Sequence, residues 1–201
     1  MSSALAARAA LAAACVSLMV GCPSLPQRPP VEPQSWDARR AELQARGTFE
    51  LAGRVAVAAG EEGFNARLRW QQSGSVSELA LDGPLGAGGL RLTSDGTQLV
   101  LTSARGERLD ADAARAEVER RLGFEPPLGS LRYWVLGVPD PASAATEQLD
   151  SEARLARLEQ NGWNIEYTSY APVEGRWLPQ RLTLRRDDVR VRLLIERWQT
   201  S

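Results

Sequence analysis

Acidic residues stand side by side at two places where paired carboxylates could act as acid and base, Glu61-Glu62 and Asp187-Asp188. A glycosidase holds two carboxyl groups on either side of its substrate, whereas adjacent acidic residues between strand-like segments are typical of solvated turns. The chain contains no histidine, which is the most common general base and a favoured metal ligand. We therefore expect no enzyme activity, no metal and no cofactor.

A glycine-rich segment at residues 83–89 could in principle hold a phosphate. Phosphate-binding loops lead from a strand into a helix and usually supply a lysine, but this segment separates two expected strands and the chain has no lysine. The net charge of −1 also gives no reason to expect a nucleic-acid partner. The segment does present one large apolar residue, Leu85, between Pro84 and Gly86. Leu85 either folds back onto the core or is exposed for contact with a membrane or ligand.

The amino terminus has the layout of a bacterial lipoprotein precursor. One charged residue, Arg8, precedes an apolar run at residues 9–20, which is too short to span a bilayer comfortably. The run ends in Gly21-Cys22, and the other cysteine, Cys15, lies within the run itself. Cleavage before Cys22 would leave that thiol without a disulfide partner, so we expect it to carry lipid. The alternative is an ordinary secretory leader with an incidental cysteine.

The rest of the chain predicts one domain built mostly from strands. Residues 1–21 are expected to be the signal peptide, residues 22–34 a lipidated cysteine with a proline-rich tether, and residues 35–201 a single folded domain. Ser35 is a candidate cap for a helix over 36–46, which Gly47 can end. Period-two patterns then predict about nine strands, at 48–59, 64–72, 77–81, 90–94, 97–103, 154–160, 163–170, 177–186 and 189–198.

Two further helices are expected between these blocks of strands. Asp110 is a candidate cap for residues 111–122, with Gly123 at the end, and a second helical segment covers 130–136. Asp95-Gly96 and Asn161-Gly162 predict tight hairpin turns. A long antiparallel sheet must curl to protect its edges, so the sequence predicts a mainly β (α+β) fold, a barrel-like sheet with a helical lid. The pattern leaves open whether the interior is filled or hollow, and whether the six tryptophans form a core or a ligand pocket.

Several segments resemble the LolB family of outer-membrane lipoprotein-sorting receptors, and the resemblance covers nearly the whole mature chain. No single segment is decisive, but their order and spacing behind a lipobox are specific together. The segments are Gly53-Arg54-Val55-Ala56-Val57, Trp70-Gln71-Gln72, Leu81-Asp82-Gly83-Pro84-Leu85-Gly86, residues 131–139 (LRYWVLGVP), Gly162-Trp163 with Tyr167 and Tyr170, and Leu178-Pro179 with the closing strand to Trp198.

The resemblance implies a half-open antiparallel barrel whose helical lid encloses an apolar cavity for acyl chains. It implies a receptor, anchored at the periplasmic face of the outer membrane, that takes lipoproteins from the periplasmic carrier LolA and places them in the membrane lipid. It also implies that Leu85 protrudes and assists membrane placement. We expect a monomer. Our candidates for the cavity are inward-facing apolar residues whose strand parity is open: Leu68, Trp70, Leu79, Leu81, Leu90, Leu92, Trp134, Trp163, Ile165 and Tyr167. The alternative function is a structural lipoprotein of an envelope assembly with a filled core.

Overall fold

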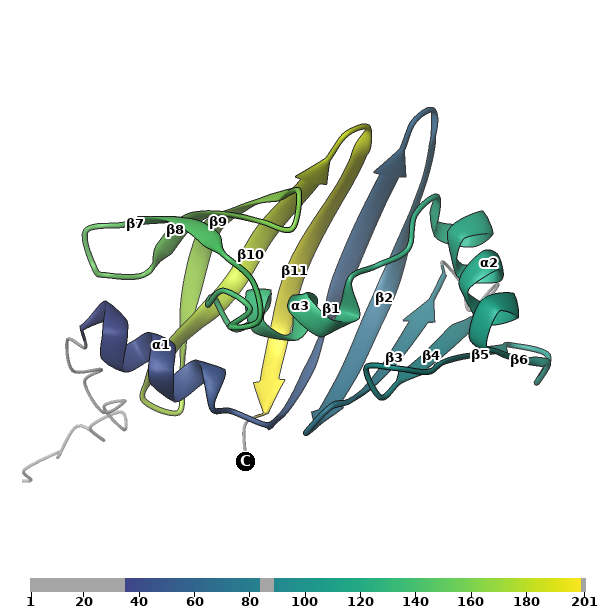
Figure 1. Cartoon of the computed structure of the whole chain (residues 1–201), viewed down its shortest axis with the longest axis horizontal. Helices are drawn as coiled ribbons and strands as arrows, with labels where there is room; N and C mark the ends of the chain where they lie inside the picture. Colours follow the sequence, from purple (N-terminus) through teal and green to yellow (C-terminus); the bar gives the residue numbers. More distant parts are fainter. Residues whose placement is uncertain (1–34, 84–88, 200–201) are drawn as a thin grey trace, which may run out of the picture.

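The computed structural model describes residues 35–83 and 89–199, which form an antiparallel sheet of eleven strands with three helices (Figure 1). The helices are α1 (Trp36–Gln44), α2 (Ala111–Leu122) and α3 (Leu128–Trp134). The strands are β1 (Thr48–Ala59), β2 (Glu62–Ser73), β3 (Val76–Asp82), β4 (Leu90–Ser94), β5 (Leu99–Ser103), β6 (Arg108–Asp110), β7 (Ala145–Leu149), β8 (Leu155–Gln160), β9 (Trp163–Val173), β10 (Arg176–Arg186) and β11 (Val189–Gln199).

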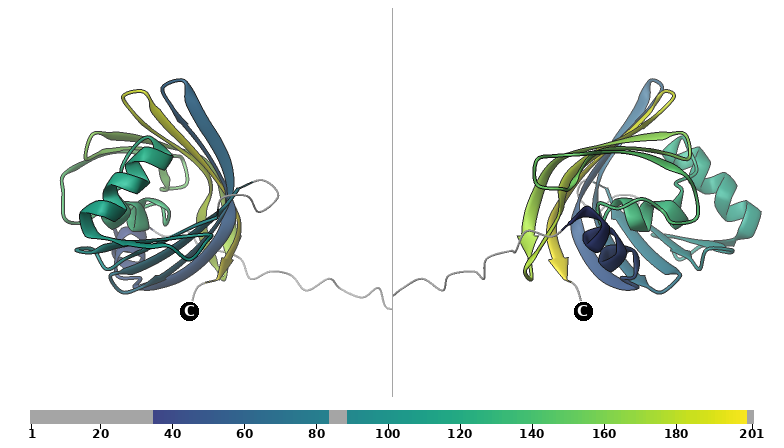
Figure 2. Two further views of the ribbon diagram at one scale, coloured as in Figure 1. Left: turned by 90° about the vertical axis from the view of Figure 1, so that its right-hand side faces the viewer. Right: turned by 60° about the vertical axis from the view of Figure 1, so that its left-hand side comes forward.

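The strand order is β6-β5-β4-β3-β2-β1-β11-β10-β9-β8-β7, so almost every strand lies beside its neighbour in the sequence. The exception is the pairing of β1 with β11, which joins the two ends of the described chain at the centre of the sheet. The sheet curls around the helices (Figure 2). Its edge strands β6 and β7 do not pair with each other, so the barrel is only partial. This confirms the expected mainly β, antiparallel architecture.

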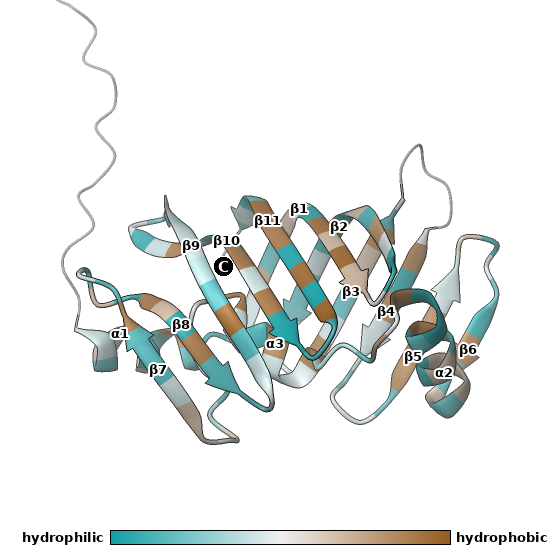
Figure 3. Cartoon of the chain, turned by 90° about the horizontal axis from the view of Figure 1, so that it is seen from above, coloured by the Kyte–Doolittle hydropathy of each residue, from teal (hydrophilic) through white to brown (hydrophobic). Residues whose placement is uncertain are grey.

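Alternation of buried and exposed residues explains why these segments are strands. In β1 the side chains of Phe49, Leu51, Val55 and Val57 are buried, while Arg54 between them is exposed. The bands of opposite hydropathy along the central strands follow the same alternation (Figure 3). One face of the sheet therefore packs against the helices, and the other faces solvent.

Some of the expected boundaries and turns are wrong. The sheet has eleven strands where about nine were expected, because β6 and β7 are additional. The β4–β5 connection is a four-residue loop, in which the Asp95 carboxylate accepts hydrogen bonds from the backbone of Thr97 and Gln98. Asp110 precedes α2 but makes no capping hydrogen bond, because its carboxylate pairs with Arg108 at 3.2 Å. The expected helix at 130–136 is α3, which begins two residues earlier.

Other local predictions are confirmed. The hydroxyl of Ser35 accepts a hydrogen bond from the backbone of Ala38 and caps α1. Gly123 ends α2 with a positive φ of 80°, the left-handed conformation expected after a helix. Asn161 and Gly162 both have positive φ, as a type I′ hairpin turn requires. In the part of the chain that the structure describes, no helix has the length and apolar character needed to cross a membrane.

Candidate functional site

An apolar cavity lies between the inner face of the central strands and the segment that links α2 to α3. Its floor comes from β1, β2, β3, β4, β9, β10 and β11, and its roof from residues 122–131. All of its lining residues are apolar: Val55, Val57, Phe64, Leu68, Trp70, Leu79, Leu81, Leu92, Leu122, Phe124, Pro126, Pro127, Leu128, Leu131, Trp163, Leu184, Val191 and Leu193. Such a site offers a ligand almost no hydrogen bonds and suits hydrocarbon.

The cavity is small in this conformation. Its volume is about 80 Å³, whereas pockets for small molecules usually measure about 300–1,000 Å³. It is not sealed, because Phe64, Leu81 and Leu131 are only half-buried although they line it. A ligand as long as an acyl chain would therefore have to move the roof away from the sheet.

Aromatic side chains join the roof to the far end of the floor. The ring of Phe124 lies 5.7 Å from that of Trp163, and Trp163 lies 6.4 Å from Trp134 of α3. Both tryptophans are buried. These tilted contacts add about 0.5–1.5 kcal/mol per pair to the burial of the rings, so any outward movement of Phe124 must break its contact with Trp163.

A buried polar network fixes α3 to the β8–β9 hairpin. The side-chain oxygen of Gln160 accepts hydrogen bonds from the Trp134 indole at 2.8 Å and from the backbone of Asp140 at 2.9 Å. Its amide nitrogen donates to the carbonyls of Asp140 and Ser143, both at 2.8 Å. Every hydrogen-bonding position of the Gln160 amide is satisfied, which makes this network stabilising despite its burial.

The C-terminal end of α3 has a second attachment. The hydroxyl of Tyr167 donates to the carbonyl of Trp134 at 2.9 Å. Burial raises the pKa of the Tyr167 phenol well above its usual range, so it remains a neutral donor. Together with Gln160, Tyr167 fixes α3 in place. If the roof opens, the part that moves must therefore precede α3 in the sequence.

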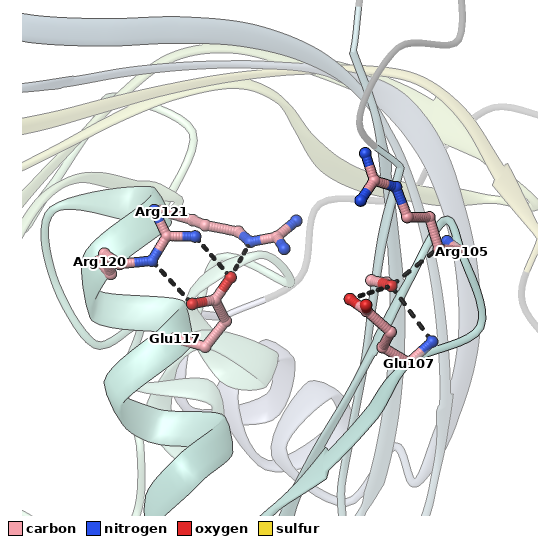
Figure 4. Close-up of polar contacts among 6 residues, drawn as sticks. Arg105, Glu107, Glu117, Arg120 and Arg121 are labelled. Carbon is pink, nitrogen blue, oxygen red and sulfur yellow. Dashed lines mark hydrogen bonds and ion pairs between the residues drawn. The ribbon is translucent and has the colours of Figure 1, made fainter.

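The helix α2 is held differently, by contacts with β5 and β6, and it carries ion pairs on its own surface. Glu117 accepts hydrogen bonds from Arg120 and Arg121 (Figure 4). These hydrogen bonds lower the pKa of Glu117 to about 2. All three charges lie on α2 itself, so the ion pairs stiffen the helix and do not tie it to the sheet.

The structure brings six of the ten predicted cavity residues together in this cavity: Leu68, Trp70, Leu79, Leu81, Leu92 and Trp163. Leu90, Ile165 and Tyr167 are buried on the inner face of the sheet and Trp134 is buried at the end of α3, but none of these four residues lines the cavity. Trp134 and Tyr167 instead hold α3 in position. The predicted lipid attachment at Cys22 and the predicted membrane-placement residue Leu85, with its neighbours Pro84 and Gly86, lie outside the described residues.

Sequence reasoning missed two groups of lining residues. Val55, Val57, Leu184, Val191 and Leu193 carry the same period-two signal as the predicted set and could have been found from it. The roof residues, Leu122 to Leu131, carry no such signal, because their contact with the sheet depends on how the helices dock.

Comparison with known proteins identifies the family. The model of the family described as "Outer membrane lipoprotein LolB" matches residues 47–198. The chain belongs to the LolB family. Relatives named outer-membrane lipoprotein LolB include one from Pseudomonas paraeruginosa, 37% identical with 94% of each chain covered, and one from Pseudomonas fluorescens, 36% identical with 92% of each covered.

Solved structures with little sequence similarity share the fold of this LolB-family chain. A LolA superfamily protein from Nitrosomonas europaea has a TM-score of 0.55 at 9% identity, over 84% of this chain and 94% of that one. A DUF1329 family protein from Desulfovibrio piger has a TM-score of 0.53 at 7% identity, over 83% and 91%. The curled sheet with helices on its inner face is therefore a fold that this chain shares with both of these proteins.

Proposed function

We propose that this protein is an outer-membrane lipoprotein that accepts lipoproteins from the periplasmic carrier LolA and places them in the outer membrane. In this proposal Cys22 carries the lipid anchor at the periplasmic face of that membrane, and the incoming acyl chains enter the apolar cavity. The protein acts as a binding receptor and not as an enzyme. Membership of the LolB family supports the proposal.

The observation that carries the proposal is the entirely apolar lining of the cavity. A triacylated cysteine exposes three chains of roughly 15 methylenes, and at about 0.8 kcal/mol each their transfer to water costs on the order of 35 kcal/mol. Such a lipid needs a covered apolar route between carrier and membrane. Transfer requires no energy source if the receptor binds the acyl chains more tightly than the donor carrier does, and if the bilayer binds them more tightly than either protein.

The small volume of the cavity defines the conformational step that acceptance requires. Because Gln160 and Tyr167 fix α3, we expect the segment 122–127 and the end of α2 to move outward when acyl chains enter. This movement would expose Phe124, which is buried. Part of the binding free energy must therefore be used to open the roof, which weakens retention and favours release into the bilayer.

The test is a transfer assay with the lipidated full chain reconstituted in liposomes. A donor carrier loaded with radiolabelled lipoprotein is added, and the label is followed first to the receptor and then to the liposome. We expect transfer that depends on the receptor. If liposomes bearing the correctly folded chain receive no more lipoprotein than protein-free liposomes, the proposed function is wrong.

A matched pair of leucines tests the role of the cavity in acceptance. Leu131 lines the cavity, whereas Leu109 in β6 does not, and both are half-buried. Leu131→Asn places an amide among hydrocarbon and should weaken acyl-chain acceptance, because unpaired polar groups are costly in an apolar site. Leu109→Asn should leave acceptance unchanged. Equal effects of the two substitutions would exclude the cavity as the acyl site.

Leu85 and Cys22 are tested in the same assay. Burial of a leucine in the lipid interface contributes only about 1.5–3 kcal/mol, enough to orient the protein but not to anchor it. Leu85→Glu should therefore preserve acceptance and impair release into the liposome, and unchanged delivery would refute this role. Cys22→Ala should abolish incorporation of labelled palmitate in growing cells, and incorporation that persists would refute lipidation at Cys22.

One observation favours a different function. A cavity of about 80 Å³ is also compatible with a filled core, as in a structural lipoprotein of an envelope assembly. Such a protein would bind no acyl chains in the transfer assay and would fail to protect a fluorescent fatty acid from water. Uptake of that probe by the wild-type chain, lost in Leu131→Asn, would exclude the structural role.

A further inference from the structure

A basic groove crosses the outer face of the sheet, on the side opposite the cavity. It has a volume of about 1,000 Å³ and is open to solvent. Four arginines line it, Arg54, Arg67, Arg181 and Arg192, with Asp82 as the one acidic lining residue. The chain as a whole is almost neutral, so positive charge is concentrated here.

The strand register forces like charges together on this face. Within the groove, Arg54 of β1 lies directly opposite Arg67 of β2, while Asp82 of β3 lies opposite Arg67 on its other side. Residues opposite each other in antiparallel strands have Cβ atoms about 4.5–5.5 Å apart, and like charges in such pairs are destabilising. A bound anion would relieve this repulsion.

The acidic residues nearby neutralise only part of the positive charge of the groove. Arg54 pairs with Glu196 at 2.8 Å, and Asp82 is held by Arg69 at 2.9 Å. Within residues 35–83 and 89–199, Arg67, Arg181 and Arg192 make no ion pair, and all three are exposed. Three guanidinium groups are therefore free to bind a partner.

The centre of the groove is open because small residues lie between the arginines. Ala56 of β1 stands opposite Arg192 on one side and Asn65 on the other. Leu194 lies between Arg181 and Arg54 and is half-exposed. The groove thus combines guanidinium groups with a small apolar patch, and both features suit a phospholipid at its headgroup level.

Another depression of the outer face shows that this charge is local. It measures about 530 Å³ and is lined by Arg69, Arg91 and Arg197 together with Glu50 and Glu78. Arginines and acidic residues are nearly balanced there, so the sheet does not carry positive charge over its whole outer face. Arg91 therefore provides a control on the same face.

We propose that this groove binds the phosphate groups of anionic phospholipids and holds the outer face of the sheet against the membrane. Guanidinium groups match phosphate oxygens in bidentate geometry and keep their charge. Gly83, from which the Leu85 segment departs, also lines the groove. The choice of a lipid surface over another polyanion rests on the proposed function, since that function requires contact with a membrane.

The experiment measures sedimentation of the full chain with vesicles. All variants carry Cys22→Ala, so that no lipid anchor forms and any contribution of the apolar leader is common to every arm. Binding to vesicles of phosphatidylcholine with 30% phosphatidylglycerol is compared with binding to pure phosphatidylcholine. We expect a preference for the anionic vesicles that disappears at high salt, because interactions with surface charges are screened.

Two double variants locate the interaction. Each arginine near an anionic surface changes partitioning about fivefold, so Arg67→Gln with Arg192→Gln should weaken anionic binding about 25-fold. The control, Arg91→Gln with Arg157→Gln, removes the same charge from two exposed strand residues outside the groove and should change binding less than about threefold. Circular dichroism checks that both remain folded.

The outcomes separate this inference from the proposed function. Equal losses in the two double variants, or the absence of any preference for anionic vesicles, would overturn the groove proposal even if lipoprotein transfer works. Displacement of the chain from vesicles by inorganic phosphate or an oligonucleotide at low concentration would also overturn it, because the groove would then be a general polyanion site. If the chain binds anionic vesicles but transfers no lipoprotein, the groove proposal stands and the proposed function is refuted.

Discussion

The substitution Gln160→Leu tests whether the buried network fixes α3. Gln160 is 3% exposed and makes four hydrogen bonds, and Trp134, one of its partners, is completely buried. Leucine would leave the Trp134 indole N–H without an acceptor or access to water, at a cost of about 1–3 kcal/mol. Asp140 and Ser143 are half-buried and can be partly hydrated, so we expect a total loss of about 2–5 kcal/mol.

Urea denaturation followed by circular dichroism and tryptophan fluorescence measures this loss as a change in the free energy of unfolding. A change of that size should lower the Tm by roughly 5–15 °C. The control is Gln148→Leu in β7, because Gln148 is exposed and its replacement should stay within about 0.5 kcal/mol. A loss below about 1 kcal/mol for Gln160→Leu would refute the role assigned to the network.

A double-mutant cycle with Trp134→Phe isolates the bond between the two side chains. Phenylalanine has no N–H to leave unpaired, so Gln160→Leu should cost less in that background than in the wild type. We expect a coupling energy of about 1 kcal/mol or more. Strictly additive effects would mean that the 2.8 Å bond between Gln160 and Trp134 contributes nothing.

Three further predictions concern single groups. Tyr167→Phe removes the hydroxyl that donates to the Trp134 carbonyl, which keeps its hydrogen bond from the Gly137 backbone, so the free energy of unfolding should fall by about 0.5–1.5 kcal/mol. An unchanged urea midpoint would contradict this. Gly53→Ala would place a Cβ 2.0 Å from the carbonyl oxygen of Leu194, so β1 and β11 must separate and the Tm should fall by at least about 4 °C. An unaltered melting curve would refute the close approach of the two strands. Glu117 has a lowered pKa, so its ion pairs should stabilise the fold at pH values above the ordinary glutamate pKa near 4.5 and lose that effect as the pH falls toward 2. A titration of the Glu117 carboxyl chemical shift with a midpoint near 4.5 would contradict this.

The strands that could be predicted from the sequence are those that bury one face. The bounds of β1 and β4 agree with the expected segments residue for residue, because buried and exposed residues alternate along them. The edge strands β6 and β7 contain no fully buried residue. Without a buried face they have no period-two pattern of apolar residues, so nothing in the sequence pattern predicts them.

The cavity could be predicted only in part, for a related reason. A strand pattern tells which residues share a face, and it placed Leu68, Leu79 and Leu92 together correctly on the inner side. It does not tell where along that face the helices leave a space. Tyr167 was therefore predicted as a cavity residue, whereas the structure places it beneath the end of α3, where its hydroxyl donates to the carbonyl of Trp134.

The two faces of the sheet depend on one irregularity in β11. Ile195 and Trp198 are three residues apart, so in a regular strand they would point to opposite faces. The register shift at Ala52/Gly53 gives β11 one extra residue, and Ile195 then lies opposite Gly53 while Trp198 lies opposite Leu51. Both reach the inner face, where Trp198 contacts Phe49 at 5.7 Å between ring centroids.

The same shift keeps the arginines of β11 outside. With Leu193 opposite Val55 on the inner face, Arg192 stands opposite Ala56 on the outer face. A regular strand that kept Trp198 inward would turn Arg192 toward the cavity and Leu193 toward solvent. The bulge therefore permits an apolar cavity on one face and a basic groove on the other, and the close approach of Gly53 to β11 is what accommodates it. Acyl-chain binding and membrane contact, as proposed, would thus rest on a single feature of strand pairing.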